Sequence, residues 1–106
     1  MTTFYFVTLP NQSNSMAIPD LDKMSEQELW AFWRRYNCPS RRDAEQLVGD
    51  TRKNYITIAS IFACYACNRA LVLQGQRENN PGAIEAYDHA RKLAFERLPA
   101  DLRWGE

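Results

Sequence analysis

The longest hydrophobic pattern in the chain is the run from Asn54 to Gln74, NYITIASIFACYACNRALVLQ. No charged residue occurs between Asn54 and Asn68, and at about 100° per residue the apolar residues fall on every side of a helix. A helix that is apolar all round has to be covered on several sides. A membrane span needs about 20 apolar residues, and Lys53 and Arg69 end this run too early for that. We therefore predict the buried central helix of a small bundle.

One row of this run consists of small residues that recur at intervals of four, three and four: Ala59, Ala63, Ala66 and Ala70. Such a row lets a neighbouring helix approach closely. Asp50 or Thr51 is the expected N-cap, and Gly75 is the expected C-terminal end. The pattern predicts a helix over residues 51–74, with Phe62 in its core.

A first helix is predicted over residues 25–36 by the capping box of Ser25 and Glu28, in which each side chain accepts from the other residue's backbone N–H. Met24 and Leu29 stand where a hydrophobic staple would place them. Pro39 ends the helix, because the residue before a proline avoids the α region. Its expected inner stripe is Leu29, Phe32, Trp33 and Tyr36, with Trp30 to one side.

Two more helices complete the pattern. Ser40 caps a short one over residues 40–48, and Gly49 stops it. Asn80 and Pro81 open the last one, residues 81–98, and Pro99 ends it. The inner face expected for the last helix is Ile84, Tyr87, Ala90, Ala94 and Leu98. In the tail after it, Leu102 and Trp104 are expected to fold back onto the bundle.

The N-terminal segment differs from the rest in composition. Residues 1–10, MTTFYFVTLP, suit a short strand, but we expect no partner strand within this helical chain, so a second copy or a partner protein would have to supply the edge. Residues 11–20 have the polar and turn-forming composition of a linker. We predict a disordered or loosely packed leader over residues 1–20 and a single helical domain over residues 21–106. The predicted fold is all-α, a small four-helix bundle around a buried central helix.

The length of 106 residues allows one domain, and thirteen acidic residues balance thirteen basic ones. Three cysteines do not form a disulfide framework, and the N-terminus lacks the pattern of a signal peptide. We therefore expect a cytoplasmic protein that does not engage a membrane.

Basic residues are concentrated between the first helix and the central one, where they mix with aromatic residues. The combination can hold nucleic acid, by stacking and by neutralising phosphates. Asp43, Glu45 and Asp50 lower the local charge, so only weak, salt-sensitive binding to nucleic acid is expected. The candidate contacts for a partner or a nucleic acid are Arg34, Arg35, Arg41, Arg42, Arg52 and Lys53.

Cys64 and Cys67 match the C-x-x-C spacing of redox pairs and of half metal sites, for which Cys38 and His89 would be further ligands. A redox pair normally opens a helix, whereas this one lies in the middle of an apolar run. Free cysteine is also among the most frequently buried residue types. We therefore expect both cysteines to serve packing, and we predict no metal site.

The run from Tyr36 to Ser40, YNCPS, the alanine-rich central helix and the ending with Leu98-Pro99 and Arg103-Trp104 resemble short uncharacterised proteins encoded in phage genomes. The resemblance covers roughly residues 24–104. It implies an accessory role and no particular activity, substrate or site.

No phosphate-binding loop, no nucleophile with its base and no spaced carboxylate pair occurs in the sequence. We therefore predict no catalytic residue and no cofactor. The predicted function is that of a small non-enzymatic protein–protein interaction module, such as a phage-type accessory regulator or inhibitor of a host protein. The alternative is a nucleic-acid-binding protein that uses the arginine patch. The sequence leaves the oligomeric state open.

Overall fold

A computed structural model describes residues 6–8 and 17–105. In this part of the chain the helices are Glu26–Tyr36 (α1), Arg41–Val48 (α2), Tyr55–Arg77 (α3) and Pro81–Arg97 (α4). Two short 3-10 helices, Leu21–Lys23 (η1) and Ala100–Leu102 (η2), flank the four. The predicted all-α bundle around a central helix is confirmed.

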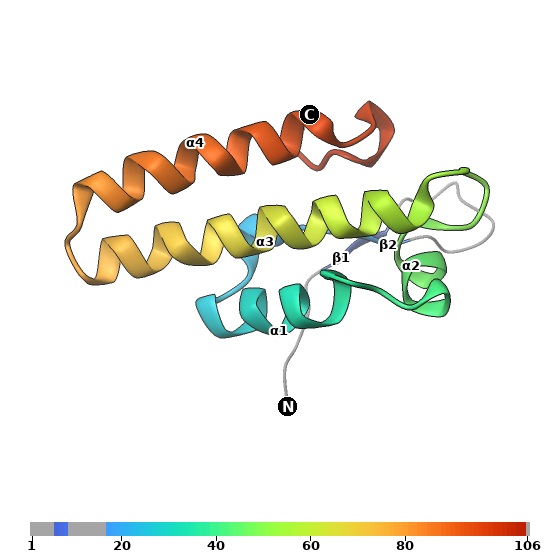
Figure 1. Cartoon of the computed structure of the whole chain (residues 1–106), viewed down its shortest axis with the longest axis horizontal. Coiled ribbons are helices and arrows are strands. Elements are labelled where there is room, and N and C mark those ends of the chain that lie inside the picture. Colours follow the sequence, from blue (N-terminus) through green and yellow to red (C-terminus); the bar gives the residue numbers. More distant parts are fainter. Residues whose placement is uncertain (1–5, 9–16, 106) are drawn as a thin grey trace.

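Helix α3 is the middle layer of the molecule (Figure 1). Helix α4 runs antiparallel along one side of it, and α1 and α2 lie on the other side with the N-terminal strands. After α4 the C-terminal segment continues towards the end of the molecule where α3 begins and then turns back, so that Trp104 lies near Phe62 and Tyr65 of α3. Every other helix therefore packs on α3.

The buried face of α3 follows the predicted pattern. All four residues of its alanine row are completely buried, and Phe62 is 1% exposed. This row lies about half a turn around the helix from the side that meets α4, so it lets α1 approach closely. The sequence prediction of a closely covered central helix is confirmed on these two sides.

The ends of α1 and α2 are as predicted. Ser25 Oγ accepts the Glu28 backbone N–H at 3.1 Å, and Glu28 Oε1 accepts the Ser25 N–H at 3.0 Å, which completes the capping box. Ser40 Oγ accepts the Asp43 N–H at 3.1 Å. Gly49 ends α2 with φ of 84°, a left-handed conformation that favours glycine.

The predicted N-terminus of the central helix was wrong by one turn. Helix α3 begins at Tyr55 after the N-cap Asn54, and residues 50–54 form bends and turns. No residue from Asp50 to Asn54 is apolar. A helical turn there would bury no apolar side chain, and tertiary packing supplies most of a helix's stability.

The predicted C-terminus was also wrong, because α3 continues through Gly75 to Arg77. The left-handed residue is Asn79, with φ of 54°. Its N–H bonds to the Gln76 carbonyl at 3.2 Å and the Asn80 N–H bonds to the Gly75 carbonyl at 2.8 Å, which is a Schellman motif. Gly75 has a packing role instead: it is buried where Ile84 of α4 crosses α3.

The strand predicted near the N-terminus has a partner within the chain, contrary to our expectation. Phe6–Thr8 (β1) pairs antiparallel with Ala17–Pro19 (β2), and Pro19 is fully buried. The predicted leader otherwise falls on residues 1–5 and 9–16, which lie outside the described residues.

The inner face predicted for α4 is only partly buried. Ala94 and Leu98 are core residues, Ile84 and Ala90 are half-buried, and Tyr87 is 36% exposed. Among the other helices α4 packs mainly on α3, so its loop-side half has less cover. The tail does fold back as predicted, and Leu102 and Trp104 are buried.

The burial of Phe62 leads to a first prediction. Phe62→Ala would remove a ring that packs near Trp104, with centroids 6.0 Å apart, and we expect it to lower the free energy of unfolding by about 3–5 kcal/mol. The matched control is Thr57→Ala, at an exposed position of the same helix, which should change it by less than about 0.5 kcal/mol. Denaturant titration followed by far-UV circular dichroism measures both. Equal midpoints for the two variants would contradict the burial of Phe62.

The contact at Gly75 leads to a second prediction. A Cβ added there would lie 3.0 Å from Ile84 Cγ1 and 3.3 Å from the Ile84 backbone nitrogen. Only a shift of α4 relieves the second contact, so Gly75→Ala should destabilise the protein by about 1–3 kcal/mol despite its better helix propensity.

Gly82→Ala in α4 is the matched control for this substitution. Its Cβ would meet only Asn80 Oδ1, at 3.7 Å, so it should stabilise the protein by up to about 1 kcal/mol. The same titration measures both variants. Two changes of the same sign would show that close packing does not govern Gly75.

Candidate functional site

The basic residues predicted as a partner contact do not form one uniform patch. Arg35 Nη2 donates to Asp43 Oδ1 at 3.2 Å and to Gln46 Oε1 at 3.5 Å, which ties α1 to α2. Its guanidinium also lies 5.2 Å from the centroid of the Tyr36 ring. Arg52 pairs with Asp101 of the C-terminal segment. These two arginines therefore hold elements of the fold together.

The other four basic residues are exposed, and the structure gives none of them an ion-pair partner among the described residues. Arg41 and Arg42 belong to the first turn of α2, and Lys53 belongs to the turn before α3. Arg34 lies on α1, where it lines a surface hollow. The four side chains are thus available to a partner.

The hollow on α1 has a volume of about 400 Å³ and is lined by Glu26, Gln27, Trp30 and Arg34. Glu26, Trp30 and Arg34 recur at one-turn intervals along one flank of the helix. Trp30 is half-buried, and its ring meets Trp33 edge to face with centroids 5.7 Å apart. The hollow therefore presents an immobilised aromatic surface beside a guanidinium.

The acidic wall of this hollow is already neutralised. Arg77, at the end of α3, donates to Glu26 Oε1 at 2.9 Å and to Glu26 Oε2 at 3.3 Å. Arg34 has no such partner in the described part of the chain. The hollow as a whole thus favours a negatively charged ligand.

Sequence reasoning missed this hollow, although it placed Trp30 to one side of α1. The Glu26–Arg77 pair joins residues that are 51 positions apart, so no local sequence pattern predicts it. The available signal was the spacing of Trp30 and Arg34, one turn apart on a predicted helix.

The two cysteines of the C-x-x-C match are free and half-buried. Burial raises the pKa of the Cys67 thiol, and the neighbouring Cys64 adds to this. A raised pKa disfavours the thiolate that redox and metal chemistry need. The proposed further ligands, Cys38 and His89, are both exposed. Among the described residues no group of three or more side chains is arranged to hold a metal ion.

A polar network that the sequence did not predict joins both ends of the domain to the central helix. The Asp22 carboxylate accepts the Tyr65 hydroxyl at 2.6 Å and the Trp104 indole N–H at 2.9 Å. Arg91 Nη1 donates to Tyr65 Oη at 2.7 Å, and Arg91 Nε donates to Asp88 Oδ1 at 2.8 Å. The network links η1, α3, α4 and the C-terminal segment.

The network changes the titration of two of its members. Burial raises the pKa of the Tyr65 hydroxyl, and the Asp22 carboxylate raises it further. The hydrogen bond from Arg91 lowers the pKa of Asp88, whose carboxylate also pairs with Lys92 at 3.2 Å. The neutral phenol and the charged carboxylate are thus the stabilised forms, and these are the forms that make the hydrogen bonds of the network.

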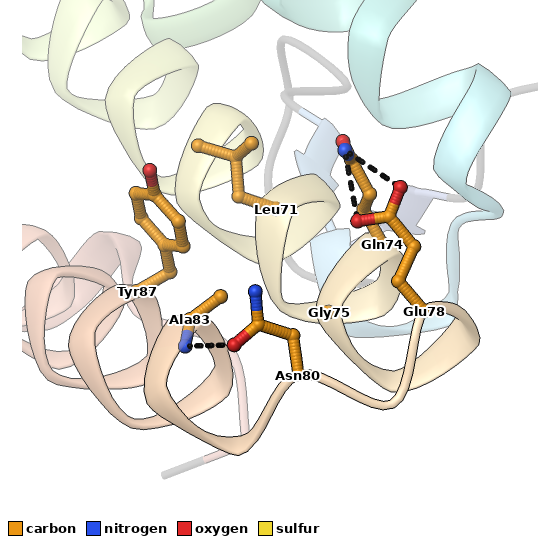
Figure 2. A pocket seen from close by; sticks show the side chains of 7 residues that line it. All are labelled: Leu71, Gln74, Gly75, Glu78, Asn80, Ala83 and Tyr87. Atoms are coloured by element: carbon orange, nitrogen blue, oxygen red, sulfur yellow. Dashed lines mark hydrogen bonds between the residues drawn. The ribbon is translucent and has the colours of Figure 1, made fainter.

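A second hollow, of about 190 Å³, lies between the last turns of α3 and the first turns of α4 (Figure 2). Leu71, Ala83 and Tyr87 give it apolar walls, and Asn80 uses its amide oxygen to cap α4 at 3.2 Å from the Ala83 nitrogen. Gln74 and Glu78 hydrogen-bond each other at 3.4 Å on its rim. The Gln74, Glu78 and Asn80 side chains thus each make a hydrogen bond within the protein.

Comparison of this chain with protein-family models, with curated proteins and with solved structures gave no match. By length and composition alone, α3 could cross a membrane, although the core helix of a soluble protein meets the same test. Half of the residues in its most apolar window are buried inside the protein.

The position of Tyr65 in the network leads to a third prediction. Tyr65→Phe removes a hydroxyl that both donates and accepts, so it should lower the free energy of unfolding at neutral pH by about 1–3 kcal/mol. Because the native state favours the neutral phenol, the contribution of Tyr65 is complete below the unfolded pKa of about 10 and is lost as the pH rises further.

Above about pH 10 the variant's stability should therefore fall less steeply than the parent's, by up to about 1.4 kcal/mol per pH unit. Denaturant titrations between neutral pH and about pH 11 measure the two slopes. Tyr87→Phe, at an exposed tyrosine, is the control and should follow the parent. Parallel curves for the parent and Tyr65→Phe would contradict the prediction.

Proposed function

We propose that this protein is a small non-enzymatic interaction module that binds a larger protein as an accessory regulator or inhibitor. The observation that carries the proposal is the α1 hollow, where Trp30 and Arg34 lie side by side on the outer face of a rigid helix. Tryptophan and arginine are the residues most enriched at the energetic centres of protein interfaces.

Contacts with the rest of the protein hold the α1 hollow in place. Trp30 packs against the core on one side, and α1 is held by its capping box and by the Glu26–Arg77 pair. A ring that is already fixed in the free protein loses little conformational freedom when a partner covers it. This rigidity favours binding.

Charge indicates the kind of segment that the hollow accepts. Arg77 neutralises Glu26, so Arg34 is the charge that remains for a ligand. Its guanidinium can bind a carboxylate with two hydrogen bonds, while the Trp30 ring takes an apolar side chain next to it. The proposed partner segment therefore combines an acidic residue with an apolar one.

Binding of nucleic acid is the second candidate function, and the exposed pair Arg41 and Arg42 favours it. Neither has an ion-pair partner among the described residues, so both could reach phosphates. Arg35 and Arg52, however, are engaged with Asp43 and Asp101. The cationic surface is smaller than the sequence indicates, which is why this function ranks second.

The fourth prediction tests the order of these two functions. The tagged full chain is used to capture proteins from a lysate of the organism that encodes it, and the captured proteins are identified by mass spectrometry. Trp30→Ala and Arg34→Glu should each reduce recovery of the partner at least tenfold, which corresponds to about 1.4 kcal/mol. Lys92→Glu, at an exposed lysine of α4, is the control and should capture as the parent does.

Equal capture by the parent and both α1 variants would contradict the assignment of the partner site to the hollow. A gel shift measures the second candidate in parallel. Tight binding of DNA or RNA at physiological salt, lost in the Arg41→Glu/Arg42→Glu variant, would reverse the order of the two functions.

A further inference from the structure

The two cysteines of α3 take no part in the polar network or in the α1 hollow. Cys64 and Cys67 are free and half-buried, and they lie on the open side of α3, which the other elements cover only in part. Asn68 and Leu71, on the same side, are also half-buried. Neither cysteine side chain is enclosed in the core, so a small molecule can approach the pair.

The spacing of the two cysteines along α3 brings their thiols close together. Residues three apart lie on the same face of a helix, with Cβ atoms about 5–6 Å apart. The thiols also influence each other, since Cys64 adds to the effect of burial that raises the pKa of Cys67. Their Cα atoms lie about 5 Å apart by helix geometry, within the range of about 4.4–6.8 Å that a disulfide spans. A bond between the two sulfur atoms can therefore close within one turn of α3.

A disulfide at this spacing would strain the helix. It needs Cβ atoms about 3.5–4.5 Å apart, which is about 1 Å closer than a regular helical turn places them. Cys64 is also held in its reduced position, because Asn68 Nδ2 donates to its carbonyl at 3.0 Å and to its sulfur at 3.6 Å. Strained disulfides are more easily reduced than relaxed ones. The bond would therefore be reversible rather than a permanent part of the fold.

The turn that would be strained carries the centre of the polar network. Tyr65 and Ala66 lie between the two cysteines, and both are buried in the core. The Tyr65 hydroxyl donates to Asp22 at 2.6 Å and accepts from Arg91 at 2.7 Å. A displacement of about 1 Å away from these partners takes both bonds beyond the usual range of about 2.5–3.2 Å. Closure of the disulfide thus acts directly on the contacts that hold η1 and α4 to α3.

From these observations we propose that Cys64 and Cys67 are a redox-sensitive modification site, at which a low-molecular-weight disulfide such as oxidised glutathione closes a reversible bond within α3. The closed form weakens the contacts of Tyr65 and so loosens the packing of the chain ends on the central helix. The inference does not depend on the proposed function.

The reaction consists of two thiol–disulfide exchanges. The thiolate of one cysteine attacks oxidised glutathione, which forms a mixed disulfide and releases one glutathione thiolate. The thiolate of the other cysteine attacks the protein sulfur of the mixed disulfide, which forms the bond within α3 and releases the second glutathione thiolate. The two protein thiols are oxidised, the glutathione disulfide is reduced, and the two cysteine protons pass to the released thiolates. Because burial raises the pKa of the Cys67 thiol, the pair reacts faster as the pH rises.

The fifth prediction concerns the free thiols of the folded full chain. The protein is equilibrated without denaturant in mixtures of reduced and oxidised glutathione, blocked with N-ethylmaleimide and digested with trypsin. One peptide, residues 54–69, contains both cysteines of α3. By mass spectrometry it should carry two maleimide groups under reducing conditions, and neither maleimide nor glutathione in excess oxidised glutathione. Cys38→Ser, at an exposed cysteine outside the pair, is the control and should give the same result.

Denaturant titration of the reduced and oxidised forms measures the effect on the fold. A disulfide that closes so short a loop constrains the unfolded chain little, so strain should dominate and oxidation should lower the midpoint. In Tyr65→Phe the hydroxyl contacts are already absent, so oxidation should lower the midpoint by a smaller amount than in the parent. Cys64→Ser/Cys67→Ser is the control and should have the same midpoint in both buffers.

Three outcomes would overturn the inference. The first is a peptide that carries two maleimide groups at every glutathione ratio, and the second is a peptide that carries glutathione in place of an internal bond. The third is an oxidised parent whose midpoint is not lowered, or is lowered equally in Tyr65→Phe. That result would separate the cysteine pair from the contacts of Tyr65.

Discussion

The carboxylate of Asp22 connects parts of the chain that no secondary structure joins. It accepts hydrogen bonds from Tyr65 in the middle of α3 and from Trp104 near the C-terminus. The two residues bonded to it are also in edge-to-face contact, with ring centroids 4.7 Å apart. Without this acceptor the Tyr65 O–H and the Trp104 N–H would lack an acceptor in a mostly buried place, and an unsatisfied donor of this kind costs about 1–3 kcal/mol. The packing of both chain ends on α3 depends on this carboxylate.

The aromatic cluster beside Asp22 explains how so small a domain builds a core. Trp104 contacts Phe62, Tyr65 and Phe95, which belong to α3 and α4. Large rings bury much apolar area per residue, which a chain of this length needs. Arg91 then covers the cluster, with its guanidinium 5.5 Å from the centroid of the Tyr65 ring. The C-terminal segment thus acts as part of the core.

The sequence by itself determined the helices, because the signals for them are local. The capping box of Ser25 and Glu28, the proline after Asn80 and the uncharged run of α3 each act within a turn or two of the backbone. On α1 the same periodicity predicted the buried residues Leu29, Phe32 and Tyr36 correctly, whereas Trp33 of the predicted inner stripe is only partly buried. The ends of α3 were misplaced for a physical reason. A helix extends for as long as its residues make stabilising tertiary contacts. Gly75 is the point where α4 crosses α3, and it does not end the helix.

Only the tertiary structure decided what the polar and exposed residues do. Asp22, Arg35, Arg52 and Arg77 look alike in the sequence as solvated charges, yet each binds a residue on another element. Such pairs depend on which elements are brought together, and spacing along the chain carries no information about that. The same holds for the α1 hollow and for the open side of α3, since a surface is defined by what the rest of the chain leaves uncovered.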